Sequence, residues 1–292
     1  MRVFVTGATG FIGSAVVPEL IKGGHQVLGL TRSENGAKAL AAAGAEVHRG
    51  QIEDVDSLRR GAEKTEAVIH LAFNHDFSRF QQNCEEDKRA IEAMGGVLAG
   101  GERHLIVTSG FAGLGGPGQV ATEENDLPPN APFPRVSEQT ALSLKGVSAS
   151  IVRLSQIHDT VKAGLVTYLI AHAREKGIAA YIGDGANRWA AAHVSDVGRL
   201  YRLALEKHES GAKYHAVAEE GVPMREIAEA IGRGLKIPVK SLSPEEAPAH
   251  FGWLGMFAGH DVVGSSAITR QKLGWNPTGP GLLTDLDQHR YL

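Results

Sequence analysis

The sequence has little cysteine, no long hydrophobic run and no excess of charge of one sign. Its single cysteine, Cys84, excludes an internal disulfide, and no Cys or His cluster has the spacing of a zinc site, so no metal is expected. No stretch reaches the ~18 apolar residues of a membrane span, and the first residues lack the basic and apolar segments of a signal peptide. These absences favour a cytoplasmic protein with no membrane partner.

The charge balance excludes a further class of partner. With 30 basic and 33 acidic side chains and a net charge of −3, the chain lacks the basic surface typical of nucleic-acid-binding proteins, so a small molecule is the expected partner. Glycine is abundant instead, at 36 of 292 residues without a collagen-like period. The chain is long enough for one α/β domain with a smaller lobe.

Strand-like apolar segments alternate with helix-like segments along the first half of the chain. Strands are predicted at 2–6, 26–30, 46–49, 67–72, 104–108 and 149–154, with helices at 14–22, 37–43, 56–62, 84–99 and 137–144. This alternation predicts the α/β class with a doubly wound parallel sheet. We expect residues 1–157 to form this core and residues 158–292 to form a smaller α/β substrate-binding lobe, with segments around 180–217 as candidates to return to the sheet.

A glycine-rich segment lies between the first predicted strand and the first predicted helix. In it, Gly7 permits a tight turn, Gly10 lets the backbone approach a phosphate, and Gly13 lets helix and strand pack closely. The N-terminus of the helix adds N–H donors and a positive dipole end. The pattern predicts dinucleotide binding by Thr6, Gly7, Thr9, Gly10, Phe11, Ile12 and Gly13.

This segment, TGATGFIG, resembles the fingerprint of the extended branch of the short-chain dehydrogenase/reductase family, which includes nucleotide-sugar epimerases and dehydratases. Further matches follow in order at 68–72, 83, 107–109, 193–197 and 273–277. The resemblance covers nearly the whole chain and implies a Rossmann fold, a nicotinamide cofactor and oxidoreductase chemistry. It also suggests a homodimer through the helices at 84–99 and 137–144, although no apolar stripe marks them.

The residue after the second strand indicates which cofactor is bound. Relatives that bind NAD(H) usually have Asp or Glu there for the ribose hydroxyl, whereas Arg32 and Ser33 suit a 2′-phosphate, so NADP(H) is predicted. Arg32 is alternatively a solvated surface residue. Gln51 and Ile52 are expected beside the adenine, although a polar loop residue explains Gln51 equally well. The candidates for the ribose and nicotinamide side are Leu71, Ala72 and Phe73.

The proton-transfer residues implied by the resemblance are absent. Family members that reduce ketones use a Tyr, a Lys four residues later and a Ser or Thr from the fifth strand. Alignment on Ser137 places Pro134 at the tyrosine and Glu138 at the lysine, and Gly110 falls at the serine. No tyrosine of the chain is followed by a lysine four residues later. The usual triad therefore cannot be transferred to this sequence.

Three residues are the candidates to replace the proton-transfer triad of the family. Arg135 could orient or polarise a substrate oxygen but not transfer protons, because its pKa is too high. His75 is a candidate proton donor at the sheet's carboxyl edge, and Ser109 ends the fifth strand near the expected nicotinamide. His158 and His193 also lie near that edge, but His193 fits a structural role better.

These observations predict an NADP(H)-dependent oxidoreductase that acts on a small organic substrate without the usual Tyr and Lys. Hydride transfer needs mainly placement and exclusion of water, so an activated alkene, an imine or a quinone fits this site better than a simple ketone. The second half of the chain also has polar residues that we expect to face the site, namely Arg188, Trp189 and His193. They favour a protein that binds a small-molecule substrate over a pure redox sensor. The alternatives are a non-catalytic NADP(H)-binding redox sensor and a nucleotide-sugar epimerase or dehydratase.

Overall fold

A seven-stranded parallel sheet forms the larger part of the molecule. The computed structural model describes residues 1–111, 113–116, 118–127 and 134–291. The strand order is β3-β2-β1-β4-β5-β6-β10, and each neighbouring pair runs parallel. The strands are β1 (Arg2–Thr6), β2 (Gln26–Thr31), β3 (Glu46–Arg49), β4 (Ala67–His70), β5 (His104–Gly110), β6 (Ser148–Leu154) and β10 (Lys213–Ala216).

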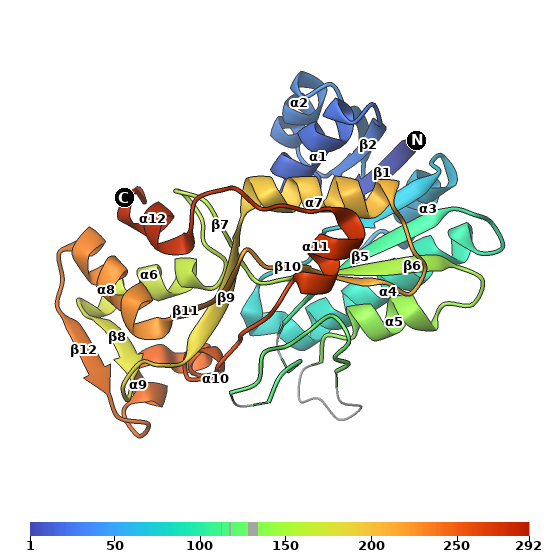
Figure 1. The fold of residues 1–292 in the computed structure, drawn as a ribbon. Helices are drawn as coiled ribbons and strands as arrows, with labels where there is room; N and C mark the ends of the chain where they lie inside the picture. Colours follow the sequence, from blue (N-terminus) through green and yellow to red (C-terminus); the bar gives the residue numbers. More distant parts are fainter. Residues whose placement is uncertain (112, 117, 128–133, 292) are drawn as a thin grey trace.

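Helices cover both faces of this sheet (Figure 1). One face carries α1 (Gly13–Lys22), α2 (Glu34–Ala42) and α7 (Val194–Glu206), and the other carries α3 (Val55–Glu63), α4 (Phe80–Leu98) and α5 (Ser137–Ser143). Alternate side chains of a strand enter separate cores, since Ile106 packs on the first face and Val107 on the second. The predicted α/β fold with a doubly wound parallel sheet is confirmed.

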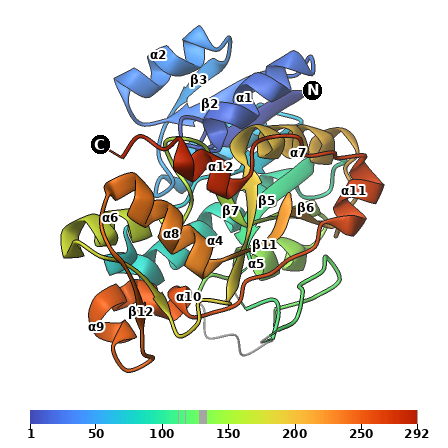
Figure 2. The same cartoon turned by 60° about the vertical axis from the view of Figure 1, so that its left-hand side comes forward.

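The second lobe lies beyond the carboxyl end of β6 and has a core of its own (Figures 1 and 2). A three-stranded sheet joins β7 (Gln156–His158), β9 (Arg188–His193) and β11 (Glu219–Pro223), and a pair joins β8 (Ala179–Ile182) to β12 (Val239–Leu242). Its helices are α6 (Val166–Lys176), α8 (Met224–Leu235), α9 (Ala247–Phe251), η2 (Gly252–Leu254), α10 (Gly255–Ala258) and α12 (Leu282–Asp287).

The second half of the chain also contributes to the main sheet. Lys213–Ala216 pairs in parallel with β6, and α7 packs along α1. Gly198 of α7 allows this approach, because a Cβ there would lie 2.8 Å from the carbonyl oxygen of Ala15. The remaining helix, α11 (Ala267–Leu273), packs beside β10. In the part of the chain that the structure describes, no helix is both long and apolar enough to cross a bilayer.

The carboxyl ends of the central strands form one edge that faces the second lobe. Thr6 ends β1 beside His70, which ends β4, and His70 is in register with Val107 of β5. The segment after β4 runs through the 3₁₀ helix η1 (Phe77–Arg79) into α4. In open α/β sheets this edge is where ligands bind. The glycine-rich loop and the candidate residues after β4 and β5 therefore meet there.

Candidate functional site

The glycine-rich loop has the geometry that its spacing predicts. Gly7 has a φ of +66°, and a Cβ there would lie 2.8 Å from the backbone nitrogen of Ala72 at the end of β4. A Cβ on Gly13 would lie 2.1 Å from the carbonyl oxygen of Gly7. Any larger residue at these two positions would separate β1 from α1 or β4. The two glycines therefore hold the turn against the sheet edge.

The loop presents hydrogen-bond donors suited to a phosphate. Within the described residues, the backbone N–H groups of Phe11, Ile12 and Gly13 donate to no backbone carbonyl, and the N-terminus of α1 has no side-chain cap. A Cβ on Gly10 would meet only the Gly7 carbonyl oxygen, at 3.1 Å. Unused donors and the positive end of a helix dipole fit the pyrophosphate of a dinucleotide.

The side chain of Thr6 does not add to these donors. Thr6 is fully buried, and its Oγ1 accepts a hydrogen bond from the Ala72 N–H at 3.2 Å and contacts His70 Nδ1 at 2.7 Å. The Thr6 hydroxyl is therefore already used inside the sheet edge, where it positions the loop. Cofactor binding by Thr6, as by the other residues of the loop, stays a prediction.

The turn after β2 carries the residues expected at the adenosine end. Arg32 is exposed and forms no ion pair or hydrogen bond with any described residue. Ser33 caps α2 by accepting a hydrogen bond from the Gly36 N–H at 3.0 Å. Arg49, at the end of β3, donates to the Ser33 carbonyl at 2.8 Å and was not singled out from the sequence. Two cationic residues therefore flank this turn.

Gln51 and Ile52 follow β3, in the connection to α3. Gln51 is exposed, whereas Ile52 is half-buried against the core on the α3 side of the sheet. Leu71 and Ala72 are half-buried where β4 ends, next to Gly7. The residues proposed for the adenine thus follow the outermost strand β3, and those proposed for the ribose follow the central strand β4, at the same carboxyl edge of the sheet.

A chain of hydrogen bonds runs from the glycine-rich loop to the start of α5. His70 Nδ1 lies 2.7 Å from Thr6 Oγ1, and His70 Nε2 lies 3.2 Å from Asp87 Oδ1. The Ser137 hydroxyl donates to Asp87 Oδ2 at 2.5 Å and accepts a hydrogen bond from Arg135 Nε at 2.9 Å. Thr6, His70, Asp87 and Ser137 are each at most 1% exposed. We call Thr6, His70, Asp87, Ser137 and Arg135 together the polar chain.

With Asp87 ionised and His70 neutral, the polar chain has one consistent set of proton positions. A carboxylate only accepts, so Asp87 takes hydrogen bonds from His70 Nε2 and from Ser137. His70 Nδ1 then accepts the Thr6 hydroxyl proton. Burial opposes ionisation of Asp87, but hydrogen bonds from His70 and Ser137 and the charge of Arg135 outweigh it and lower the pKa of this carboxyl. The polar chain therefore keeps the Asp87 carboxylate ionised and connects it to Arg135 through the Ser137 hydroxyl.

Arg135 is fixed at the carboxyl edge of β5. Its Nη2 donates to the Thr108 carbonyl at 3.1 Å, and its guanidinium carbon lies 4.1 Å from the ring centre of Phe73. The side chain is half-buried, and no described residue accepts a hydrogen bond from its Nη1. A guanidinium held on three sides with unused donors on the fourth is suited to an anionic or polarised oxygen.

The other two catalytic candidates differ in their surroundings. His75 has an exposed side chain. Even so, desolvation by the surrounding residues and the charges of Arg135 and Lys162 lower the pKa of its imidazole. Lys162, in the turn after β7, lies with its Nζ 6.0 Å from the ring centre of Phe11 and was missed by sequence reasoning. Ser109 is buried, and Arg135 contacts the carbonyl of the preceding residue. The structure thus brings His75, Phe73 and Arg135 together.

The aligned lysine position and the nearest tyrosine are used elsewhere. Glu138 is buried and forms an ion pair with Arg153 of β6, so it takes no part in the polar chain. Tyr201 of α7 is fully buried, and its hydroxyl lies 2.7 Å from Thr108 Oγ1. Burial raises the pKa of Tyr201. Neither residue supplies a proton donor at the sheet edge.

The polar residues expected from the second lobe have partners of their own. Trp189 is completely buried and so presents no group to a substrate, and Arg188 pairs with Asp261 at 3.3 Å while its side chain stays partly exposed. His158 is also buried and lies 2.7 Å from Asp285. His193 caps the N-terminus of α7, in line with a structural role.

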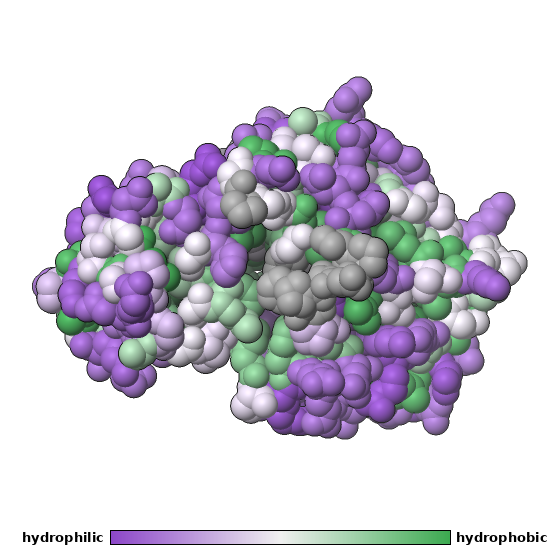
Figure 3. Space-filling view, turned by 90° about the horizontal axis from the view of Figure 1, so that it is seen from below, coloured by the Kyte–Doolittle hydropathy of each residue, from purple (hydrophilic) through white to green (hydrophobic). Residues whose placement is uncertain are grey.

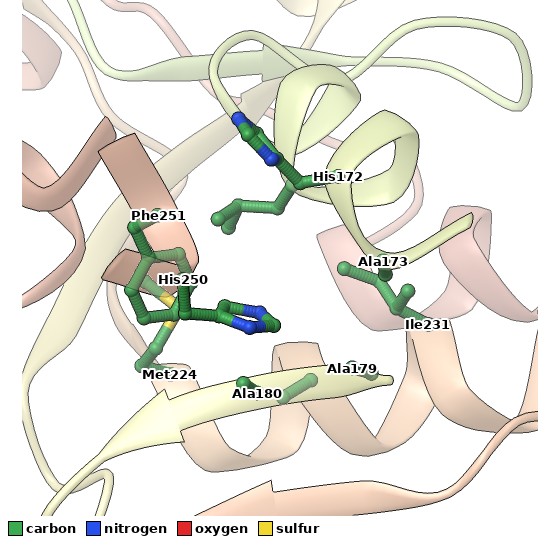
Figure 4. Close-up of a pocket in the computed structure, with 10 residues that line it drawn as sticks. His172, Ala173, Ala179, Ala180, Met224, Ile231, His250 and Phe251 are labelled. Atoms are coloured by element: carbon green, nitrogen blue, oxygen red, sulfur yellow. The ribbon is translucent and has the colours of Figure 1, made fainter. Parts of the chain in front are cut away.

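A small cavity in the second lobe is separate from this site (Figure 4). It lies between α6, β8, α8 and α9, with the imidazole of His250 directed into it. Its volume is about 10 Å³, enough for about one water molecule. No residue of the glycine-rich loop or polar chain lines it. Among the described residues, no group of three or more His, Cys, Asp or Glu side chains is placed to hold a metal.

Comparisons with known proteins agree with this arrangement. The model of the NAD dependent epimerase/dehydratase family matches residues 3–218. The chain is 49% identical over 295 residues to an uncharacterised protein of Schizosaccharomyces pombe, covering 100% of both chains. It is 28% identical over 249 residues to the 2-alkyl-3-oxoalkanoate reductase of Stenotrophomonas maltophilia, covering 78% of this chain and 73% of the relative.

A solved structure shares the fold. The dTDP-glucose 4,6-dehydratase DesIV from Streptomyces venezuelae, with NAD and TYD bound, matches with a TM-score of 0.75 at 21% identity and covers 99% of this chain and 97% of its own. The doubly wound sheet with its glycine-rich turn defines a Rossmann-type protein. The chain belongs to the NAD-dependent epimerase/dehydratase family, among the short-chain dehydrogenases and reductases, whose relatives include reductases, epimerases and dehydratases that use nicotinamide dinucleotides.

Proposed function

We propose that the chain is an NADP(H)-dependent oxidoreductase in which Arg135 orients and polarises the substrate oxygen. The observation that carries the proposal is the attachment of Arg135 to Thr108, Ser137 and Phe73, with Nη1 left available toward the sheet edge. Related enzymes place a tyrosine and a lysine in this region. The guanidinium retains the positive charge that such a site needs but has no proton to give at neutral pH.

The residues of this chain would have separate roles in the reaction. A bound nicotinamide dinucleotide supplies or accepts the hydride. The N–H groups at 11–13 bind its pyrophosphate, and Arg135 stabilises negative charge that develops on the substrate oxygen or nitrogen. His75 is mostly neutral at pH 7 because its pKa is lowered, so solvent supplies the proton or His75 relays it. Reduction of an activated alkene, an imine or a quinone suits this division better than reduction of a simple ketone.

The preference for NADP(H) rests on the turn after β2. Arg32 is exposed without a described partner, and Arg49, at the end of β3, donates a hydrogen bond to Ser33 of this turn. An Arg fork binds a phosphate through paired hydrogen bonds, whereas Glu34, the nearest carboxylate, is paired with Arg49. Arg32→Ala is expected to weaken NADPH binding while leaving NADH binding nearly unchanged, as measured by fluorescence titration. Equal affinity of the unmodified protein for both dinucleotides would contradict the preference.

One activity experiment tests the proposal. Consumption of NADPH is followed with a panel of enones, imines, quinones and simple ketones, using the unmodified protein and the variants Arg135→Lys and Arg135→Ala. Turnover of at least one conjugated substrate is expected, with kcat/KM reduced in both variants because lysine cannot reproduce the contacts to Thr108 and Ser137. Tight NADPH binding without turnover of any substrate would instead identify a redox sensor.

A further inference from the structure

Five aromatic side chains from separate segments meet beside Arg135. Phe73 and Phe77 lie in the connection from β4 to α4, and Phe80 begins α4. Tyr168 comes from α6, and Trp253 comes from η2. Phe77 stacks on Trp253 with ring centres 4.2 Å apart and meets the edge of Tyr168 at 5.7 Å. Phe73 and Phe80 continue the series at 6.2 Å. We call these five residues the aromatic cluster.

The aromatic cluster is not part of a buried core. Trp253 is 37% exposed, and the other four rings are half-buried, whereas Trp189 and Trp275 are 0% and 2% exposed. Only 6% of the chain is aromatic. In Figure 3 the outer ends of both lobes are largely hydrophilic, while hydrophobic and weakly polar residues gather where the lobes meet. Partly exposed aromatic side chains gathered beside a cationic group are typical of a ligand-binding surface.

The chemistry of the aromatic cluster restricts what it could bind. Its polar groups are limited to the Tyr168 hydroxyl and the Trp253 indole N–H, so a sugar would lose most of its hydrogen bonds to water without replacement. A flat conjugated ring instead contacts aromatic side chains favourably by stacking or by edge contacts. The guanidinium over Phe73, 4.1 Å from its ring centre, lies at one end of the series and can bind one oxygen of such a ring.

We propose that the aromatic cluster and Arg135 together bind planar conjugated cyclic dicarbonyl compounds, with quinones as the substrate class. This inference rests on the proposed function, because it names the acceptor for the same site. The quinone takes up a hydride from the reduced dinucleotide and one proton from solvent, which gives the hydroquinone and the oxidised dinucleotide. Arg135 binds the oxygen that gains negative charge before it is protonated.

Tryptophan fluorescence tests binding apart from turnover. Menadione is titrated into the protein saturated with NADP⁺, which cannot reduce it, and the quenching is corrected for absorbance. Saturable quenching is expected, and Trp253→Phe should remove most of it, since Trp253 is the exposed tryptophan. Phe77→Leu and Tyr168→Leu should each raise the apparent Kd by about tenfold. The matched control is Tyr181→Leu, which removes a half-buried ring 5.2 Å from Arg225 outside the aromatic cluster.

The outcomes separate this inference from the proposed function. Quenching that is unsaturable, or equally weakened by Tyr181→Leu, overturns the quinone site, as does tighter quenching by UDP-glucose than by menadione. A Phe77→Leu variant with a lower Tm and an unchanged Kd would show that the rings only hold the lobes together. NADPH turnover of enones or imines that persists in the aromatic variants leaves the proposed function standing. Saturable menadione binding without any turnover supports the site and rejects the enzyme.

Discussion

Glu138 and Arg153 form an ion pair inside the protein, with Arg153 Nε donating to Glu138 Oε2 at 2.9 Å. Their side chains are 4% and 0% exposed. Arg153 also donates to the carbonyl of Asn125 at 2.8 Å, so it connects β6, α5 and the segment before α5. Because Glu138 is paired with Arg153 inside the protein, it does not neutralise Arg135, which lies just before α5 at the sheet edge.

This ion pair leads to a stability prediction. Arg153→Met leaves the Glu138 carboxylate buried without its partner, so the free energy of unfolding should fall by about 3–5 kcal/mol in urea denaturation at pH 7. The double variant Glu138→Leu with Arg153→Met also removes the buried carboxylate, so its free energy of unfolding should fall by less than that of Arg153→Met alone. The control is Arg233→Met, which breaks an exposed pair with Asp287 and should cost under about 1 kcal/mol. Equal losses in the single and double variants would show that the buried charge is not the cause.

Much of the main sheet could be predicted because its signals are local. Apolar runs such as 67–70 and 104–107, bounded by helical segments, fix the strand positions, and the turn at 7–13 follows from steric needs of glycine. The second lobe was predicted less well. Strand β7 has only three residues, and the partners of β9 come from distant segments: the indole N–H of Trp189 donates to the His260 carbonyl at 3.2 Å. The hydrophobic periodicity of a segment does not show which distant residues will contact it.

The candidate site was predictable only in part. The sequence pointed to Arg135, but its value depends on the Thr108 carbonyl and on Phe73, which reach it only in the folded chain. Asp87 was missed, although a signal was present. On α4 it falls on the same helical face as the buried Asn83 and Ile91, and a carboxylate among buried positions is costly unless it has partners.

Gly13 provides a second prediction. A Cβ there would lie 2.1 Å from the Gly7 carbonyl oxygen, so Gly13→Ala should displace α1 from the turn, destabilise the protein by about 1–3 kcal/mol and weaken NADPH binding. Thermal unfolding and fluorescence titration measure the two effects. Gly96→Ala is the matched control, since Gly96 lies within α4 and nothing surrounds its Cβ position within 4 Å. We expect this control to bind NADPH normally. If both variants bind alike, the close contact at Gly13 has no role in binding.

Two histidines with lowered pKa values, the half-buried His208 and the buried His215, predict that acid destabilises the fold. Burial, with the neighbouring His104, lowers the pKa of His208 to about 4, and burial lowers that of His215 to about 3 against an opposing hydrogen bond to the Ser265 carbonyl. Both stay neutral in the folded protein while the unfolded chain takes up protons below about pH 6.5. The stability they contribute is therefore complete above that pH and is lost as the pH falls toward 4.

Urea denaturation at pH 7, 6 and 5 measures this loss. The completely buried His215 alone should lower the free energy of unfolding by up to about 1.4 kcal/mol per pH unit below 6.5. His215→Gln should flatten the pH dependence even if it lowers stability at pH 7. A variant whose stability still falls as steeply as that of the unmodified protein would assign the pH dependence to other groups.

The polar chain gives the last prediction, for Asp87. Asp87→Asn keeps the shape of the side chain but removes the negative charge that helps to hold Arg135 through Ser137. Because hydrogen bonds to charged groups contribute about 1.5–3 kcal/mol, kcat/KM should fall by about tenfold or more, with a smaller change in NADPH affinity. The control on the same helix is Glu92→Gln, which loses only an exposed pair with Lys88 at 3.8 Å. A lower Tm with unchanged kcat/KM would mean that Asp87 stabilises α4 without positioning Arg135.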